Sequence, residues 1–323
     1  MKLHFFGDTV LDQVYQLSFD PELFVLNLET PLSCEGTPAL HKVNLCQDHS
    51  YIVETFGGRP LSVSLANNHV MDFGEEAFLK TKATLEASGI PYFGAGLEGE
   101  NFNNPSVIEF SGKRIALCGY SCPSVHAVLG DATQHGSAKL DLARMIADIE
   151  AIKPEVDFII IQPHWGIQEI PFPRFSDREI AHALIDAGAD IIIGHHAHVI
   201  QSHEIYKGRY IFYGLGNFIF PDLDVPTRYD GQKFTQRRIK KQEIEHRRSL
   251  VVTLDENFEV DFFTVELQGT RVMPKAFAVP TWLPPSESSF NRRLKREQKR
   301  IRIRNFLRNP RVPNLGHLRR LFQ

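Results

Sequence analysis

Residues 195–198 place three histidines within four positions, directly after the apolar run at residues 191–193. A buried strand gains nothing from three imidazoles at its end, whereas neutral imidazole is a common ligand of transition metals. If the backbone stays extended, successive side chains alternate between the two faces of the strand. His196 and His198 then point the same way, and we predict that both bind metal. His195 points to the other side, as a neighbour or wall of the site.

Four earlier apolar stretches also end on side chains that can bind metal. These side chains are Asp8, Glu29, Asn68 with the adjacent His69, and His164. One polar residue at the end of a strand is ordinary, but five successive strand ends with oxygen or imidazole donors are not. Buried charges without partners cost on the order of several kcal/mol each, so we expect these groups to be paired or to coordinate metal.

A pair of divalent metal ions fits this set of donors. Carboxylates supply hard oxygen ligands and negative charge, and imidazoles suit Mn, Fe, Zn or Ni. A bridging carboxylate can hold two ions about 3.5–4 Å apart, and water bound there becomes hydroxide near neutral pH. We therefore predict two divalent transition-metal ions, Mn, Fe or Zn, and the hydrolysis of phosphate esters.

The segments that carry these residues alternate between strand and helix over the first 220 residues. Helical patterns at residues 74–89, 141–155 and 176–188 separate apolar, strand-like segments. Such alternation predicts an α/β layered fold in which ligands bind at the carboxyl ends of the strands. Residues 249–267 read as an antiparallel hairpin, and the charged residues 221–248 as a loop or an insertion.

The composition is that of a globular protein with a basic C-terminal segment. The 323 residues are 42% hydrophobic and 23% charged, with a formal net charge of −3. Residues 286–323 hold twelve Lys or Arg and two Glu, so the rest of the chain is acidic. We predict one domain at residues 1–270 and a basic tail at residues 271–323. The tail is either solvated or a contact for a membrane surface or an acidic polymer, and no motif indicates specific binding of nucleic acid.

The cellular location is inferred from the cysteines and from the N-terminal segment. No stretch reaches about 18 consecutive apolar residues, and the N-terminus lacks the pattern of a signal peptide. The four cysteines form no CxxC pair. We therefore expect a cytoplasmic protein with reduced thiols, in solution or at the inner face of the membrane. The alternative is a disulfide in an exported form.

Six segments within residues 1–225 follow one another in the order of a known family. They are GDTVLD, NLETPLS, SLANNHVMDFG, GIPYFGAG, PHWGIQE and GADIIIGHHAHVIQSHEIYKGRYIFYGLGNFIF. Together they resemble the CapA family, which is linked to capsule and poly-γ-glutamate biosynthesis and belongs to the calcineurin-like metallophosphoesterase superfamily. The resemblance implies a four-layer α/β/β/α sandwich of the metallophosphatase type, with the site at its rim.

The resemblance also implies a role for each residue of the predicted site. His69 would protonate the leaving oxygen, and Asp72 would hold His69 through a hydrogen bond. Gly216 and Asn217 would line the site. The implied metal ligands are Asp8 for the first ion, Glu29 as the bridge, Asn68 for the second ion, and His164, His196 and His198.

Two motifs depart from the superfamily pattern. The first is normally Asp-x-His, but Val10 stands two residues after Asp8. One ligand of the first ion is therefore missing or comes from elsewhere, for example from Asp12. The second motif is normally GDxxD, and here it is NLE, ending at Glu29. Several family members are also anchored to the membrane from their N-terminus, whereas this chain begins directly on its first strand.

Three hypotheses about function remain open. The first is a metal-dependent hydrolase of the phosphoesterase type, which acts in capsule or poly-γ-glutamate biosynthesis on a phosphorylated or acidic polymer. The second is a non-catalytic, metal-containing accessory or scaffold protein of a polymer-synthesis complex. The third is a cytoplasmic phosphodiesterase or nucleotidase unrelated to capsule. The sequence indicates neither the substrate, nor which metal is bound, nor the oligomeric state.

Overall fold

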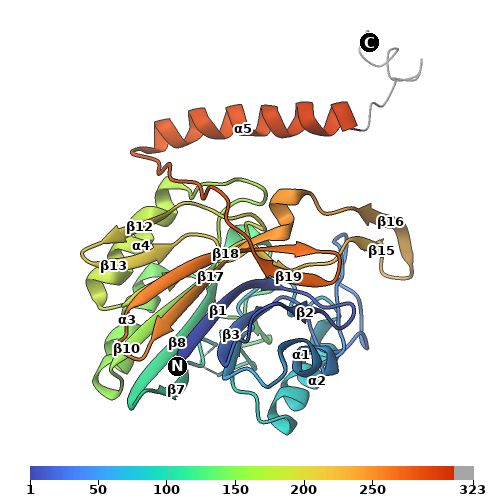
Figure 1. Cartoon of the computed structure of the whole chain (residues 1–323). Coiled ribbons are helices and arrows are strands. Elements are labelled where there is room, and N and C mark those ends of the chain that lie inside the picture. Colours follow the sequence, from blue (N-terminus) through green and yellow to red (C-terminus); the bar gives the residue numbers. More distant parts are fainter. Residues whose placement is uncertain (101, 309–323) are drawn as a thin grey trace. The chain divides into compact units, whose positions relative to one another are not determined.

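The structure is a computed structural model that describes residues 1–100 and 102–308 (Figure 1). Contacts divide the chain into two units, Met1–Leu283 and Pro284–Gln323. The strand Arg271–Pro274 (β19) belongs to the first unit, although the sequence suggests a basic tail from residue 271 onwards. The reason is that β19 pairs with the preceding strand and buries Val272 in the core.

Most strands of the first unit lie in two mixed sheets. One has the order β2-β19-β18-β17-β1-β3-β4-β5, with β14 also paired to β1, and the other has the order β12-β13-β11-β10-β8-β7. The strands that lead to the predicted site are parallel to their neighbours, β1 to β3 and β10 to β8 and β11. The nine-stranded sheet contains β1 (Lys2–Thr9), β2 (Gln16–Leu17), β3 (Leu23–Leu28), β4 (Ser62–Ser64), β5 (Tyr92–Phe93), β14 (Asn217–Ile219), β17 (Arg248–Asp255), β18 (Val260–Gln268) and β19. The six-stranded sheet contains β7 (Ser106–Phe110), β8 (Lys113–Ser121), β10 (Phe158–His164), β11 (Ile191–Ile193), β12 (His203–Tyr206) and β13 (Arg209–Phe212).

Four helices of the first unit accompany these sheets, and two small sheets complete it. The predicted hairpin at residues 249–267 is confirmed as β17 and β18. The helices are α1 (Ser50–Phe56), α2 (Gly74–Ala87), α3 (Leu142–Ile152) and α4 (Phe175–Ala187). The small sheets pair β6 (Ala95–Gly96) with β9 (Gly136–Ser137), and β15 (Leu223–Tyr229) with β16 (Phe234–Lys240).

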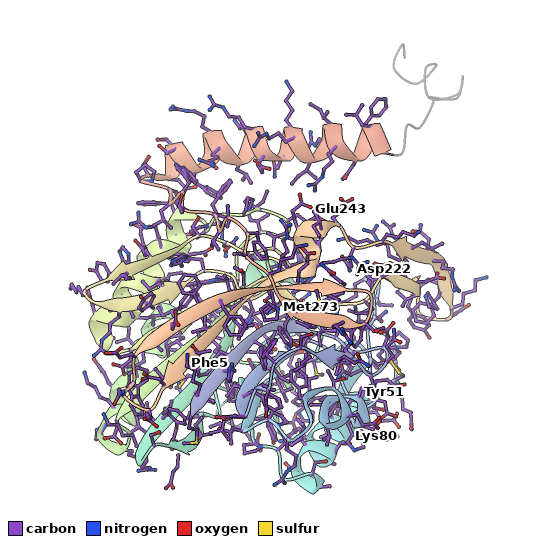
Figure 2. All side chains as sticks on the ribbon, in the orientation of Figure 1. Phe5, Tyr51, Lys80, Asp222, Glu243 and Met273 are labelled. Atoms are coloured by element: carbon purple, nitrogen blue, oxygen red, sulfur yellow. A yellow bond between two sulfur atoms is a disulfide. The ribbon has the colours of Figure 1, made fainter. Side chains whose placement is uncertain are left out.

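The hydrophobic core consists of three layers of side chains. Phe5 of β1 (labelled in Figure 2) and Ile160 of β10 belong to a cluster built from both large sheets, so the sheets pack face to face. The next residue, Phe6, points to the opposite face and joins a cluster with Phe78 of α2. Ile161 of β10 likewise joins residues of α3 and α4. This arrangement confirms the predicted α/β/β/α sandwich.

The segment expected to be a loop, residues 221–248, instead contains the hairpin β15–β16. Its base is held at Asp222 (labelled in Figure 2), which accepts hydrogen bonds from the Gln242 backbone and from Arg247. Most of β16 is exposed, so its sequence has no apolar face that would indicate a strand. The hairpin also forms isolated bridges between Leu40 and Tyr229 and between Val43 and Thr227.

A disulfide joins Cys34 to Cys46, with their Cα atoms 5.4 Å apart. The prediction of reduced thiols is therefore wrong for this pair, and Cys118 and Cys122 are the free cysteines of the described residues. A separation of 12 residues in a loop has no sequence pattern that marks a pair. The disulfide closes the loop that lies beside the candidate site.

The second unit is described as one helix, α5 (Glu287–Arg308). It carries most of the basic residues of the predicted tail, and residues 309–323 lie outside the described residues. No helix within residues 1–100 and 102–308 is both long and apolar enough to cross a membrane.

Glu204 of β12 is an ion-pair partner that links this edge strand to α4. It accepts hydrogen bonds from Arg178, His182 and the Tyr213 hydroxyl. Burial raises the pKa of Glu204, but these donors outweigh that effect and lower the pKa to about 2. Because the unfolded chain binds this proton more readily, the stabilisation is complete above the ordinary pKa of about 4.5 and is lost as the pH falls towards 2.

Glu204→Gln is therefore expected to lower the free energy of unfolding by about 1–2 kcal/mol at pH 7, because a charged acceptor is lost. Urea unfolding of both proteins at several pH values measures this difference. It should shrink as the pH falls below about 4.5, where Glu204 of the unfolded chain becomes protonated, and vanish as the pH approaches 2, where the folded protein takes up the proton too. A difference that stays constant down to pH 3 would contradict the proposed ion pairs.

Candidate metal centre

The predicted site residues lie where strands of both large sheets end. Asp8 is the penultimate residue of β1, and Glu29 directly follows β3. Asn68 and His69 lie in the turn after β4. His164 ends β10, and His196 and His198 follow β11. The rim of the sandwich therefore brings together residues that are far apart in the sequence.

Within the described part of the chain, two groups of possible metal ligands are present, and they share Glu29. One contains Glu29, His164 and His196, and the other contains Asp8, Glu29 and His198. Within each group the ligand atoms lie within 4.8 Å of one another. Asn68 lies beside the first group, with its Oδ1 2.9 Å from His164 Nε2. Glu29 is therefore the residue at which the two groups meet.

The surroundings of Glu29 fit a cation. Its side chain is fully buried, and neither carboxylate oxygen has a hydrogen-bond partner among the described residues. Burial raises the pKa of Glu29 well above its ordinary value, and the charges of Asp8 and Asp72 raise it further. A buried carboxylate without donors is costly, and divalent cations are a common partner for such groups.

Asp8 is held by several donors. Its carboxylate lies 3.3 Å from both His195 Nδ1 and His198 Nδ1, accepts from Asn27 Nδ2 at 2.9 Å and from the His196 backbone N–H at 3.1 Å. Burial alone would raise the pKa of Asp8. The hydrogen bonds and charges of His195 and His198 outweigh burial and hold the pKa well below its ordinary value. Asp8 therefore carries a negative charge in the site.

The imidazoles of His164 and His196 are suited to metal binding because they remain neutral. Burial, and then the neighbouring His196, lowers the pKa of His164 well below its ordinary value. Burial, and then the neighbouring His198, lowers the pKa of His196 to about 3. The two rings approach to 3.1 Å between His196 Nδ1 and His164 Nε2. Neutral imidazoles offer a lone pair to a cation, whereas protonated ones do not.

His69 lies beside these groups and is oriented by Asp72. The two are joined by a 2.6 Å contact between His69 Nδ1 and Asp72 Oδ2. Asp72 also accepts from the Leu45 backbone N–H at 2.7 Å and forms an ion pair with Lys42. The Lys42 ammonium in addition donates to the Asn68 carbonyl at 2.5 Å. The loop closed by the disulfide thus holds the carboxylate that orients His69.

The backbone after β11 differs from the extended strand that the sequence suggests. β11 ends at Ile193, and His196 and His198 have φ angles of +86° and +57°. The two side chains reach the site because of these left-handed conformations, so the argument from strand alternation is wrong. The turn that carries both histidines begins at Gly194, whose backbone lies close to the Tyr213 carbonyl. A Cβ at this position would lie 2.0 Å from that oxygen.

Two further residues near the site, Asp12 and Val10, clarify the departures from the family pattern. Asp12, considered as a replacement ligand, is exposed and accepts from the Tyr15 hydroxyl at 2.7 Å. It belongs to neither ligand group among the described residues. Val10 is buried with Leu45 and Phe220 in an apolar cluster. Val10 thus occupies the position of the missing histidine and packs in the hydrophobic core.

Two pockets open onto the site. The larger measures about 730 Å³ and is lined by Asn68, His69 and His196, among others. The smaller measures about 130 Å³ and is lined by His69, His198 and Asn217. A ligand in either pocket can reach His69.

Sequence reasoning missed several residues that shape this site. Lys42 and Arg174 line the larger pocket, and Arg238 and Lys240 line the smaller one. Their position at the pockets could not be predicted from the sequence, because lysine and arginine are common in charged loops and these four residues form no recognisable motif. His195 was expected to be a neighbour of the site, and it contacts Asp8 and Gln162.

A family model described as bacterial capsule synthesis protein PGA_cap matches residues 7–222, most of the chain. The chain belongs to this family. All of the predicted site residues of this PGA_cap chain lie within the matched range.

Three curated relatives share this region with the PGA_cap chain. The capsule biosynthesis protein CapA of Bacillus anthracis is 34% identical over 165 residues, 49% of this chain and 39% of that protein. The PGA biosynthesis protein CapA of Bacillus subtilis is 35% identical over 164 residues, 50% of this chain and 43% of that protein. A probable polyglutamine synthesis accessory protein of Mycobacterium tuberculosis is 30% identical over 214 residues, 61% of this chain and 55% of that protein. The matches thus span between 39% and 55% of the relatives' length.

Solved structures similar to the PGA_cap chain include two bacterial nucleotidases. A putative 5'-nucleotidase from Staphylococcus aureus has a TM-score of 0.46 at 12% identity, covering 92% of this chain and 58% of that one. A 5'-nucleotidase precursor from Thermus thermophilus has a TM-score of 0.39 at 15% identity, covering 78% and 45%.

Proposed function

We propose that the chain is a metal-dependent protein of the phosphoesterase type that acts in capsule or poly-γ-glutamate biosynthesis. Its substrate would be a phosphorylated or acidic polymer. The observation that carries this proposal is Glu29, a fully buried carboxylate without donors that is shared by two groups of ligands. Such a residue is suited to hold two divalent ions side by side.

The residues that would hold the ions are Glu29 with Asp8 and His198, and Glu29 with His164 and His196. Asn68 lies next to the group that contains His164 and offers an amide oxygen. Bound divalent ions supply Lewis-acid activation of an ester and lower the pKa of water. The choice between Mn, Fe and Zn is part of the proposal, because mixed carboxylate and imidazole ligands suit each of them.

His69 would supply the proton for the leaving oxygen. Its Nδ1 is held by Asp72, which leaves Nε2 for a ligand in the pockets that His69 lines. Burial lowers the pKa of His69 below its ordinary value, and the Asp72 carboxylate partly offsets this and fixes the orientation of the ring. The Leu45 amide and Lys42 hold Asp72 in turn.

Hydrolysis of bis(p-nitrophenyl) phosphate by the Mn²⁺-loaded full chain tests this role. His69→Asn is expected to lower turnover by about 10²–10⁴, because proton transfer by a positioned group contributes that much. Its metal content should stay the same, since the ligand groups do not include His69. His49→Asn is a matched control, because His49 is exposed and its ion-pair contact is with the exposed Asp48.

Full turnover of the His69→Asn protein would contradict the role of His69 as the acid. Bound metal without turnover of any ester by the wild type would favour the second candidate, a non-catalytic accessory or scaffold protein. One observation supports that candidate: the apolar cluster of Val10, Leu45 and Phe220 occupies the position where the superfamily motif carries a histidine. The third hypothesis, a phosphodiesterase or nucleotidase unrelated to capsule, has no support from the family assignment.

The partner and location of the chain are also proposals. The helix α5 is rich in lysine and arginine, which suits contact with an anionic membrane surface or an acidic polymer. The expectation of a cytoplasmic position, or a peripheral one at the inner face of the membrane, rests on the N-terminal segment and on reduced thiols. The disulfide between Cys34 and Cys46 removes the support from the thiols, because disulfides persist in oxidising compartments.

A further inference from the structure

The helix α5 has two unlike sides, because residues at alternating intervals of four and three lie along one side of a helix. One such series is buried or half-buried, and its members are Phe290, Leu294, Glu297 and Ile301. A second series has the same spacing on the opposite side, and all of its members are exposed: Arg292, Arg296, Lys299, Ile303 and Phe306. The exposed side is therefore basic over its first two turns and apolar at its C-terminal end.

The exposed side of α5 carries positive charge that the helix itself does not neutralise. Nine Lys or Arg and two Glu give the helix a net charge of +7. Glu297 belongs to the half-buried side and pairs with Arg300 at 3.3 Å. Arg292, Arg296 and Lys299 have neither a hydrogen bond nor an ion pair among residues 1–100 and 102–308. These three cations are available to an anionic partner.

The apolar end of the exposed side consists of Ile303, Phe306 and Leu307, which we call the apolar tip. The exposed fractions of these three side chains are 49%, 60% and 72%. Their spacing of three and four residues places them on one side of the helix. Arg302 and Arg304 are the sequence neighbours of Ile303, so they lie to either side of the tip around the helix axis. The tip is therefore an apolar patch between arginines.

We propose that α5 binds the surface of an anionic lipid bilayer, with its exposed cations at the phosphate headgroups and the apolar tip among the acyl chains. Long Lys and Arg side chains reach headgroups while neighbouring apolar side chains enter the membrane. The proposal deepens the partner proposed for α5, from which it starts, and it is independent of the metal centre.

The apolar tip is the feature that distinguishes a bilayer from a dissolved polyanion. A polyanion in water can pair with the cations of α5, but it offers no apolar phase for three aliphatic or aromatic side chains. Single-stranded nucleic acid stacks its bases on aromatic rings, and the tip contains one such ring, that of Phe306. A bilayer provides anionic headgroups and an apolar interior at the same surface.

Flotation of the full chain with vesicles tests this proposal. Vesicles of equal parts phosphatidylcholine and phosphatidylglycerol should bind the protein, whereas pure phosphatidylcholine should bind it much less. Arg296→Gln/Lys299→Gln is expected to weaken binding about tenfold or more, because each cation near an anionic surface contributes to the affinity. Lys233→Gln/Lys241→Gln removes the same charge from exposed positions of the first unit and should leave the affinity unchanged.

The apolar tip is tested by substitution and by fluorescence. Phe306→Ser/Leu307→Ser is expected to weaken binding to the phosphatidylglycerol vesicles about tenfold or more, from the loss of buried apolar area. Phe306→Trp should be quenched by lipids brominated in their acyl chains. Asn305→Trp places the same probe one residue away on the other side of the helix and should show only the quenching of the wild type.

Equal quenching of the Phe306→Trp and Asn305→Trp proteins would overturn insertion of the tip. Equal effects of Arg296→Gln/Lys299→Gln and Lys233→Gln/Lys241→Gln would overturn the part played by α5. Polyuridylate or poly-γ-glutamate in solution that binds more tightly than the vesicles, with no dependence on Phe306, would assign α5 to a dissolved polyanion and not to a bilayer.

The same variants separate this proposal from the phosphoesterase role. Vesicle binding by the His69→Asn protein should equal that of the wild type, and Phe306→Ser/Leu307→Ser should hydrolyse a soluble ester at the wild-type rate. If no ester is hydrolysed but vesicle binding depends on the tip, the phosphoesterase role fails and the membrane contact stands. If hydrolysis depends on His69 but vesicles bind none of the proteins, the membrane contact fails alone.

Discussion

Metal-free protein is expected to gain stability when Mn²⁺ or Zn²⁺ is added, and the Glu29→Gln variant is expected to gain almost none. Glu29 is the member shared by both ligand groups, and its carboxylate oxygens lack hydrogen-bond donors among the described residues. Ligand present at about a thousand times its dissociation constant stabilises the native state by about 4 kcal/mol per site. Thermal unfolding with and without metal measures this gain.

The same substitution has an opposite effect on the metal-free protein. Burial and the nearby charges of Asp8 and Asp72 make an ionised Glu29 unfavourable. A neutral amide of similar shape removes that cost, so metal-free Glu29→Gln should be at least as stable as the metal-free wild type. Glu54→Gln, at an exposed position of α1, serves as the control for the loss of one carboxylate. A metal-dependent gain in Glu29→Gln equal to that of the wild type would rule out Glu29 as the shared ligand.

Removal of the disulfide is expected to lower the free energy of unfolding by about 3 kcal/mol, from the entropy of a closed loop of this length. The Cys34→Ser/Cys46→Ser variant and the wild type in dithiothreitol should show the same loss in urea unfolding. The variant itself should not respond to dithiothreitol, which serves as the internal control. Cys118 and Cys122 are free, so they add no disulfide that the reagent could break.

The loss should extend to the site, because the closed loop carries Lys42 and Leu45, both of which contact Asp72. A looser Asp72 orients His69 less well, so the reduced protein is expected to lose ester hydrolysis before it loses metal. Equal stability of the reduced and oxidised wild type would show that the loop is held without the disulfide.

The ligand residues could be predicted from the sequence because each strand end is a local feature. Asp8, Glu29 and His164 follow apolar segments directly, and the carboxyl ends of parallel strands meet at one edge. The layers could be predicted too, because the alternation of strand and helix is a pattern of tens of residues. Recognition of the family rested on motifs that lie within these same segments.

Other features depend on contacts between distant parts of the chain. The left-handed conformations of His196 and His198 follow a close approach of Gly194 to the Tyr213 carbonyl, which no spacing in residues 191–198 indicates. Lys42 forms an ion pair with Asp72 because the loop at residues 34–46 folds onto that carboxylate. Arg238 lies at the smaller pocket because β16 pairs with β15, a pairing that its exposed, charged sequence does not suggest.

The hairpin β15–β16 also has a mechanical relation to His69. Thr227 Oγ1 donates to the Lys42 carbonyl at 2.9 Å, and the Lys42 ammonium pairs with Asp72, the partner of His69. A movement of the hairpin would therefore be transmitted to the His69 ring through Lys42 and the Asp72 carboxylate. The hairpin therefore has two relations to the site: it lines the smaller pocket through Arg238, and it contacts the loop residue that pairs with Asp72. Its displacement would change the orientation of the His69 ring.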